Sequence, residues 1–175
     1  MTTRILATIV AATALTGCMS LGDVPTDRVG QATLSYANGA PAGTVQLLES
    51  GNRLRITAAV IGAPEGAHGF HLHETGTCTR PDFTSAGGHL NPEDKNHGTL
   101  DPGGAHLGDL PNLVIASDGT GTIDTMLSGD RASAIAAIFD SDGTAVVLHA
   151  GADDYRTDPS GDAGSRIACG VVMPT

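Results

Sequence analysis

The sequence predicts an all-β fold, arranged as a sandwich or a flattened barrel. From Val29 onward, short apolar or alternating runs are separated by Gly, Asp, Asn and Pro, and no window shows sustained helical periodicity. The pairs Asp118-Gly119 and Asp142-Gly143 lie between such runs and supply the positive φ angles that tight hairpins need. The expected strands are residues 29–36, 43–48, 54–60, 68–73, 112–117, 121–127, 134–140, 144–149 and 166–172.

Alternation in the run 54–60 predicts which of its side chains face the core. Leu54 and Ile56 alternate there with Arg55 and Thr57. A strand with one buried and one solvated face shows this pattern, so we expect the two apolar residues to be buried.

The run 68–73 places two histidines side by side. Successive side chains of a strand point to opposite faces, so His71 and His73 share one face while Phe70 and Leu72 share the other. The run therefore builds half a metal site on the surface of an apolar core. His68 has the parity of Phe70, and we expect it to be buried and hydrogen-bonded rather than a ligand.

Two long loops, 74–111 and 150–165, interrupt the regular spacing of the strands. Loops longer than about fifteen residues without secondary structure are uncommon in compact domains and are usually functional or disordered. The first loop is rich in Gly, Pro and Asp and carries three histidines and Asp109. We expect a bound metal to order it.

Six of the seven histidines occur in four short motifs and could together ligate two metal ions. Imidazole suits Zn, Cu, Fe and Ni, and a mixture of imidazole and carboxylate without thiolate favours Zn or Cu over an iron-sulfur centre. Taken singly, each histidine would be read as a hydrogen-bonded structural residue. The candidate ligands are His71, His73, His89, His97, His106, His149 and Asp109.

The N-terminus resembles a bacterial lipoprotein signal. Residues 1–17 combine an early arginine with an apolar run too short to span a bilayer, and they end in Leu-Thr-Gly before Cys18. We expect Cys18 to carry lipid, residues 18–28 to form a tether and residues 29–175 to form one domain. Met19 after the cysteine favours the outer membrane, in a periplasm-facing orientation within the cell envelope. The alternative is an ordinary cleaved signal with an incidental cysteine.

Charge and cysteine content exclude some partners and suggest a disulfide. The formal net charge of −10 argues against nucleic acid and against electrostatic binding to anionic lipid. Once Cys18 is used for lipidation, Cys78 and Cys169 remain, and an even pair in an exported protein is most simply a disulfide. Two free buried thiols are the alternative.

Five motifs carry a specific resemblance to a known family. GFHLHE, SAGGHLNP, HLGDLPN, LHAGADD and AGSRIACGVV occur in the order, and at close to the spacings, of the copper/zinc superoxide dismutases, over residues 29–172. The resemblance implies a Greek-key sandwich or flattened eight-stranded antiparallel barrel with two long functional loops. It also implies superoxide as substrate and one copper and one zinc per chain.

The resemblance assigns roles to individual residues. Arg166 resembles the channel arginine that holds an anion beside copper. His89 resembles the histidine that bridges the metals and passes a proton, which makes these two residues the catalytic candidates. Asp153 resembles the carboxylate that links a copper ligand to a zinc ligand, here His71 and His97. The implied copper ligands are His71, His73, His89 and His149, and the implied zinc ligands are His89, His97, His106 and Asp109.

The chain departs from the eukaryotic pattern in its charged loop. Residues 150–165 hold four aspartates against the single cation Arg156, where eukaryotic members carry guiding lysines. Lys95, the only lysine, lies between His89 and His97 and is a candidate for steering superoxide instead. Oligomeric state stays open between monomer and homodimer, because subunit packing differs between bacterial and eukaryotic members.

The leading functional prediction is a lipid-anchored superoxide dismutase that protects the cell envelope. The alternative is a non-catalytic copper/zinc-binding envelope lipoprotein that stores or delivers metal on the same fold. A third class, an adhesive sandwich with an incidental metal, explains neither long loop.

Overall fold

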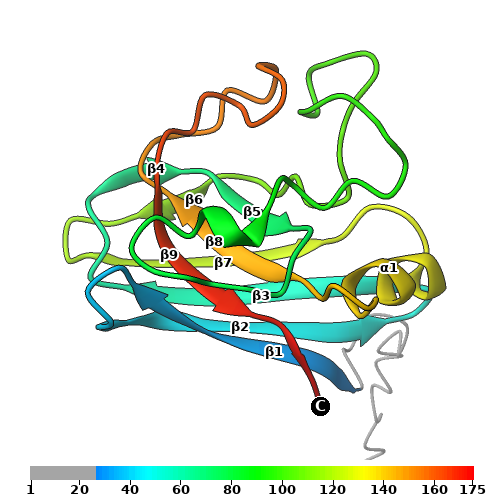
Figure 1. Cartoon of the computed structure of the whole chain (residues 1–175), viewed down its shortest axis with the longest axis horizontal. Helices are drawn as coiled ribbons and strands as arrows, with labels where there is room; N and C mark the ends of the chain where they lie inside the picture. The colour runs from blue at the N-terminus through cyan, green and yellow to red at the C-terminus, as the bar shows by residue number, and fades with distance from the viewer. Residues whose placement is uncertain (1–26) are drawn as a thin grey trace, which may run out of the picture.

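The computed structural model describes residues 27–175 (Figure 1). The predicted signal peptide, Cys18 and most of the predicted tether lie outside the described residues. None of the helices in the described part is long and apolar enough to cross a membrane. The strands are β1 (Arg28–Tyr36), β2 (Pro41–Ser50), β3 (Arg53–Ile61), β4 (Gly66–His68), β5 (Phe70–His73), β6 (Leu113–Ile115), β7 (Thr120–Met126), β8 (Ala145–His149), β9 (Arg166–Val171) and β10 (Met173–Pro174), and the one α-helix of the described residues is α1 (Arg131–Ile138).

The strands form a curled antiparallel sheet and a two-stranded ribbon. The sheet has eight strands in the order β5-β8-β9-β1-β2-β3-β7, with β10 paired to β1, and the ribbon pairs β4 with β6. Figure 1 shows the second long loop and part of the first rising on the same side of the strands, while the rest of the first loop runs across β8 and β9. The predicted all-β class with an eight-stranded antiparallel sheet is confirmed.

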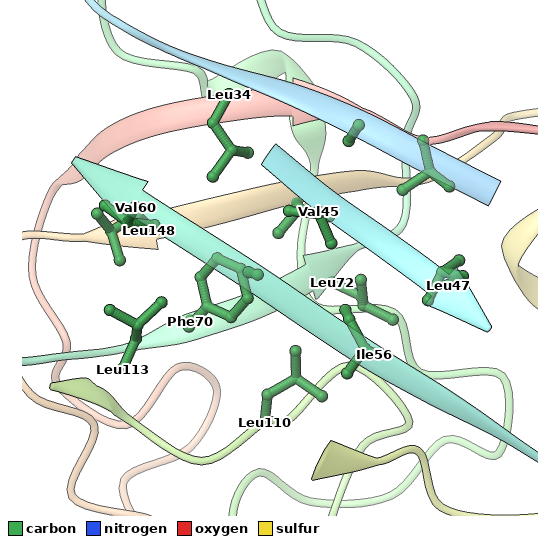
Figure 2. Packing of buried hydrophobic residues seen from close by; sticks show 14 of the residues in the cluster. Leu34, Val45, Leu47, Ile56, Val60, Phe70, Leu72, Leu110, Leu113 and Leu148 are labelled. Atoms are coloured by element: carbon green, nitrogen blue, oxygen red, sulfur yellow. The ribbon is translucent and has the colours of Figure 1, made fainter. Parts of the chain in front are cut away.

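The core lies inside the curl of the sheet, where side chains from distant strands meet (Figure 2). Leu54 and Ile56 of β3 are buried, while Arg55 and Thr57 are partly exposed, as the alternation predicts. Phe70 and Leu72 of β5 and Leu148 of β8 are fully buried in the same cluster. The strands that carry His71, His73 and His149 are therefore anchored by apolar side chains on their inner face.

The expected strand 68–73 divides at Gly69. β4 pairs with β6, whereas β5 pairs with β8, so the chain changes partner between them. Gly69 makes two backbone hydrogen bonds to the end of β8 and the start of the second loop. Its N–H donates to Gly151 O at 2.7 Å, and its carbonyl accepts from the His149 N–H at 2.9 Å. A Cβ at Gly69 would lie 2.8 Å from Ala163 Cβ, so only glycine allows this close approach.

The predicted strand at 134–140 is wrong, because this segment begins inside helix α1. The Asp130 carboxylate caps the helix by accepting the Ser133 N–H at 3.1 Å. Ala134 and Ile138, four residues apart, lie on the buried side of the helix. A helix of eight residues is too short to give a sustained periodicity, and its apolar residues are easily read as an alternating strand.

A disulfide between Cys78 and Cys169 joins the first long loop to β9, as predicted. Around it lies a second small apolar cluster on the outer face of β8, formed by Phe83, Ala86, Ala145, Val147 and Cys169. The loop therefore covers the face of β8 that also bears His149, and both faces of that strand are buried.

Candidate metal centre

Three imidazoles converge on one carboxylate oxygen at the base of the loops. The Nδ1 atoms of His89, His97 and His106 lie 2.8, 3.1 and 3.2 Å from Asp109 Oδ1. The other carboxylate oxygen, Asp109 Oδ2, accepts the N–H groups of Gly98 and His106 at 2.8 and 3.0 Å. Three nitrogens and one oxygen around one point form the closed four-ligand donor set that structural zinc takes.

A second group shares His89 with the first. His71, His73, His89 and His149 each offer a ring nitrogen, and these atoms lie within 4.8 Å of one another. Two of the nitrogens, His71 Nδ1 and His89 Nε2, are buried without a hydrogen-bond partner among the described residues. A buried polar atom without a partner costs about 1–3 kcal/mol. A metal ion at this point would satisfy both atoms, so the residues present fit one.

Three of the histidines are each held through one ring nitrogen by a backbone carbonyl. His73 Nδ1 donates to Gly87 O at 3.0 Å, His149 Nδ1 to Gly164 O at 3.2 Å, and His106 Nε2 to Lys95 O at 3.0 Å. Such bonds select the tautomer whose opposite nitrogen carries a free lone pair. The imidazoles are therefore oriented for metal binding by the chain itself.

A cavity of about 750 Å³ leads to the second group. Its wall includes His73, His89 and His149, together with Arg166 from β9. The Arg166 guanidinium donates from Nη1 to Phe83 O at 2.7 Å and from Nη2 to Gly87 O at 2.6 Å. Two backbone acceptors thus hold a positive charge at the wall of a cavity that reaches three of the four histidines.

Comparison with known proteins identifies the family. A family model described as copper/zinc superoxide dismutase (SODC) matches residues 41–172. The chain belongs to the copper/zinc superoxide dismutase family. It is 40% identical over 153 residues to Superoxide dismutase [Cu-Zn] 2 of Aquifex aeolicus, covering 83% of this chain and 87% of that protein.

Further relatives include an enzyme and a protein named only as similar to one. The chain is 38% identical over 145 residues to Superoxide dismutase [Cu-Zn] of Caulobacter vibrioides, covering 81% of this chain and 83% of that one. A crystal structure of a SOD-like protein from Bacillus subtilis superposes with a TM-score of 0.75 at 39% identity, covering 84% of this chain and all of the other. Family membership gives copper and zinc as the cofactors, and the two donor sets suit them.

The Asp153 carboxylate joins the two donor sets by contacting one histidine of each. Its Oδ2 lies 2.8 Å from His71 Nε2 and its Oδ1 lies 3.0 Å from His97 Nε2, and the carboxylate is fully buried. Asn112 holds the Asp153 backbone at two points, accepting its N–H at 2.8 Å and donating to its carbonyl at 2.9 Å. Asn112 is a functional residue that the sequence reasoning missed, although it closes the motif HLGDLPN.

Burial keeps three members of the second group neutral; we call this set (His71, His73, His89 and His149) the copper-type group and the first set (His89, His97, His106 and Asp109) the zinc-type group. Desolvation is the largest cause of the lowered pKa of His73, to about 2, of His89, to about 4, and of His149, to about 3. Neighbouring imidazoles and Arg166 lower the values for His73 and His149 further. His73 and His149 are therefore neutral at pH 7 and need lose no proton to bind a metal, whereas His89 must give up its remaining ring proton to bind metals through both nitrogens.

His97 differs because it contacts both carboxylates. Burial alone would lower its pKa, but the hydrogen bonds to Asp109 and Asp153 outweigh burial and raise the pKa to about 9. Burial would likewise raise the pKa of Asp109, yet its bonds from His89 and His97 hold that pKa well below its usual range. The zinc-type group is therefore an ion pair whose proton must leave when a metal binds.

The remaining residues singled out in the sequence differ in whether they line the cavity. Lys95 lines the cavity, and its ammonium pairs with Glu93 at 2.7 Å. Arg156 is exposed and is not among the residues that line this cavity. His68 is buried, with its ring nitrogens 2.8 and 2.9 Å from the carbonyl oxygens of His149 and Pro64, as its parity predicts.

Proposed function

We propose that the chain disproportionates superoxide to O₂ and H₂O₂ at a copper centre, with a structural zinc beside it. One observation carries the proposal. The two donor sets share His89, and the set that has two buried nitrogens without a hydrogen-bond partner among the described residues adjoins the cavity that Arg166 lines. The proposed copper ligands are His71, His73, His89 and His149, the proposed zinc ligands are His89, His97, His106 and Asp109, and Asp153 is the proposed link between them.

Bound copper would supply the one-electron redox chemistry by which one superoxide is oxidised and a second is reduced. The chain supplies the anion site and the proton. The Arg166 guanidinium attracts and orients an anion, because its position is already set by two backbone carbonyls. His89 lines the same cavity, and its Nε2 has no hydrogen-bond partner among the described residues, so it can hold the proton that the second superoxide must receive.

The direct test is pulse radiolysis of the copper- and zinc-loaded protein beside His149→Ala. We expect rapid superoxide decay in the parent protein and its near-complete loss in the variant, because one ring nitrogen of the copper-type group is gone. Gln46→Ala, on an exposed position of β2, is the control and should retain the parent rate. Absence of decay in a protein that holds one copper and one zinc per chain would reject the proposal.

The second candidate is storage or delivery of copper and zinc without catalysis. The similarity to a Bacillus subtilis protein that is named only as SOD-like supports this candidate. The presence of Arg166 at the cavity favours the enzyme, since metal storage has no need of an anion site. Measured metal release settles the choice: a storage protein yields copper readily to a chelator, whereas an enzyme retains it through many turnovers.

We also propose that Cys18 is lipidated and anchors the domain to the outer membrane, facing the periplasm. The support is the Leu-Thr-Gly-Cys sequence and the disulfide, which suits an oxidising compartment. Mass spectrometry of the N-terminal peptide should show a lipid-sized increase that Cys18→Ser abolishes. An N-terminal peptide without the added lipid mass, in a protein found away from the outer membrane, would contradict the anchor. It would leave the dismutase proposal intact.

Lys95 is proposed to steer superoxide into the cavity. Lys95 lines the cavity, whereas Arg156 is not among the residues that line it. Lys95→Ala should therefore slow dismutation and weaken its salt dependence, because long-range attraction of an anion is screened by salt. Arg156→Ala removes the same charge from the second loop and should have the smaller effect. Equal effects of the two substitutions would contradict steering from the cavity wall.

A further inference from the structure

Glu74 holds the loop residue Gly88 at two points. Its backbone N–H donates to Gly88 O at 3.0 Å, and its carboxylate Oε1 accepts the Gly88 N–H at 2.8 Å. Glu74 directly follows His73 at the end of β5, and Gly88 directly precedes His89. Glu74, next to His73, is thus hydrogen-bonded to Gly88, next to His89.

The peptide bond between Gly87 and Gly88 is the unit that Glu74 orients. On one side, its carbonyl accepts from His73 Nδ1 at 3.0 Å and from Arg166 Nη2 at 2.6 Å. On the opposite side, its N–H donates to Glu74 Oε1. Because a peptide unit is planar, holding the N–H also sets the direction of the carbonyl. A charged acceptor on the N–H further polarises the carbonyl as an acceptor.

The fit between Glu74 and this peptide is close. A Cβ at Gly87 would lie 2.7 Å from Glu74 Cγ and from Oε1, and Gly87 has a φ of +75°. The loop therefore uses glycine where the Glu74 side chain packs against it. Glu74 also lines the cavity, so its negative charge lies near the path of an approaching anion.

We propose that Glu74 is a positioning residue for the anion site. It holds the Gly87–Gly88 peptide so that one carbonyl orients both His73 and the Arg166 guanidinium, and it does so at the expense of some attraction for superoxide. The proposal rests on the proposed dismutase function. The Glu74 carboxylate has two separate effects. Its oxygen holds the Gly88 N–H through a hydrogen bond, and its negative charge repels an anion in the cavity.

Two substitutions separate these properties in the copper- and zinc-loaded protein. Glu74→Gln keeps an acceptor oxygen for the Gly88 N–H and removes the charge, whereas Glu74→Ala removes both. The first readout is hydrogen exchange of the Gly88 amide, measured by NMR with copper reduced to its diamagnetic form. The second is the affinity for azide, a small anion whose binding to oxidised copper is followed by its absorption. Glu65→Ala, at an exposed carboxylate outside the cavity wall, is the matched control.

We expect Gly88 exchange to accelerate about fivefold to tenfold in Glu74→Ala, the factor for one net hydrogen bond, and azide affinity to fall. In Glu74→Gln, Gly88 should remain protected, and azide affinity and the dismutation rate should rise about twofold, because one negative charge has left the cavity. Glu65→Ala should match the parent protein in all three measurements.

Two results would overturn the inference. One is Gly88 exchange in Glu74→Ala at the parent rate. The other is an equal loss of azide affinity in both Glu74 variants, because rescue by the glutamine oxygen is then absent. A parent protein that shows no dismutation, yet whose Gly88 protection and azide affinity still depend on the Glu74 oxygen, would reject the proposed function and support the positioning role.

Discussion

Two buried carboxylates organise the site at the level of single residues. Asp109 gathers three imidazoles around one oxygen, and Asp153 ties His71 to His97 from behind. Their tight packing leaves no room for neighbouring side chains. Gly161 lies against this bridge with a φ of +68°, and a Cβ there would overlap the Asp153 carboxylate and lie 2.7 Å from His97 Nε2.

Gly161→Ala should therefore break the Asp153 bridge. We expect zinc affinity to fall about 10–100-fold, the range for loss of an outer hydrogen-bond partner of a metal ligand. Competition with a zinc chelator measures this. Gly129→Ala is the control, because Gly129 has a similar φ of +75° but an added Cβ there would meet no atom within 4 Å. Equal losses in both variants would show that backbone strain alone is responsible.

Residue types and motif spacing predicted the histidines and Asp109 as metal ligands, whereas Arg166 was predicted only from the resemblance to the family. The support behind them was less accessible. Asn112 and Glu74 act through backbone groups of residues 41 and 14 positions away. Backbone contacts leave no pattern in a single sequence, since almost any residue supplies the same carbonyl or N–H. Such partners become visible only when the loop conformation is known.

At the level of elements, the strands were predictable where one face is buried and the other is solvated. The pattern of β3 shows this alternation directly. β8 is buried on both faces because the disulfide-bonded loop covers its outer side, yet its apolar run still predicts a strand. The alternation failed in two places. Helix α1 is too short for its period to register, and the division of 68–73 at Gly69 depends on which strands pair, which the run itself does not encode.

The disulfide is expected to stabilise the loop that holds Arg166. Cys78 and Phe83 both lie on the first long loop, and the Phe83 carbonyl accepts a hydrogen bond from Arg166. The disulfide joins residues that are 91 positions apart in the sequence. A double variant, Cys78→Ser with Cys169→Ser, should lose about 4 kcal/mol of unfolding free energy. Urea denaturation of the variant and of the oxidised and reduced parent protein measures this. A variant as stable as the oxidised parent would contradict the expectation.

At the level of the whole molecule, the site makes the stability of the metal-free protein depend on pH in two opposed ways. His73, His89 and His149 have lowered folded-state pKa values, so their contribution is present above 6.5 and is lost as pH falls towards about 4 and below. His97 has a raised pKa, so its contribution is present below 6.5 and is lost as pH rises through about 9.

The metal-free protein should therefore be most stable near pH 6.5, with a steeper decline on the acid side, where three histidines gain protons on unfolding. Urea denaturation at pH 5, 6.5 and 9 in the presence of a chelator measures this. His97→Gln should flatten the alkaline decline and leave the acid decline in place. Stability that increases steadily from pH 6.5 to 9 in the parent protein would contradict the assignment of His97.

One imidazole, His89, separates the proposed copper site from the proposed zinc site. X-ray diffraction from crystals of the copper- and zinc-loaded protein, at wavelengths on either side of each metal's absorption edge, tests this arrangement directly. We expect copper bonded to His71 Nδ1 and His89 Nε2, and zinc at about 2.0–2.2 Å from His89 Nδ1 and Asp109 Oδ1. Both metals mixed at one site, or a metal bound away from His89, would contradict it.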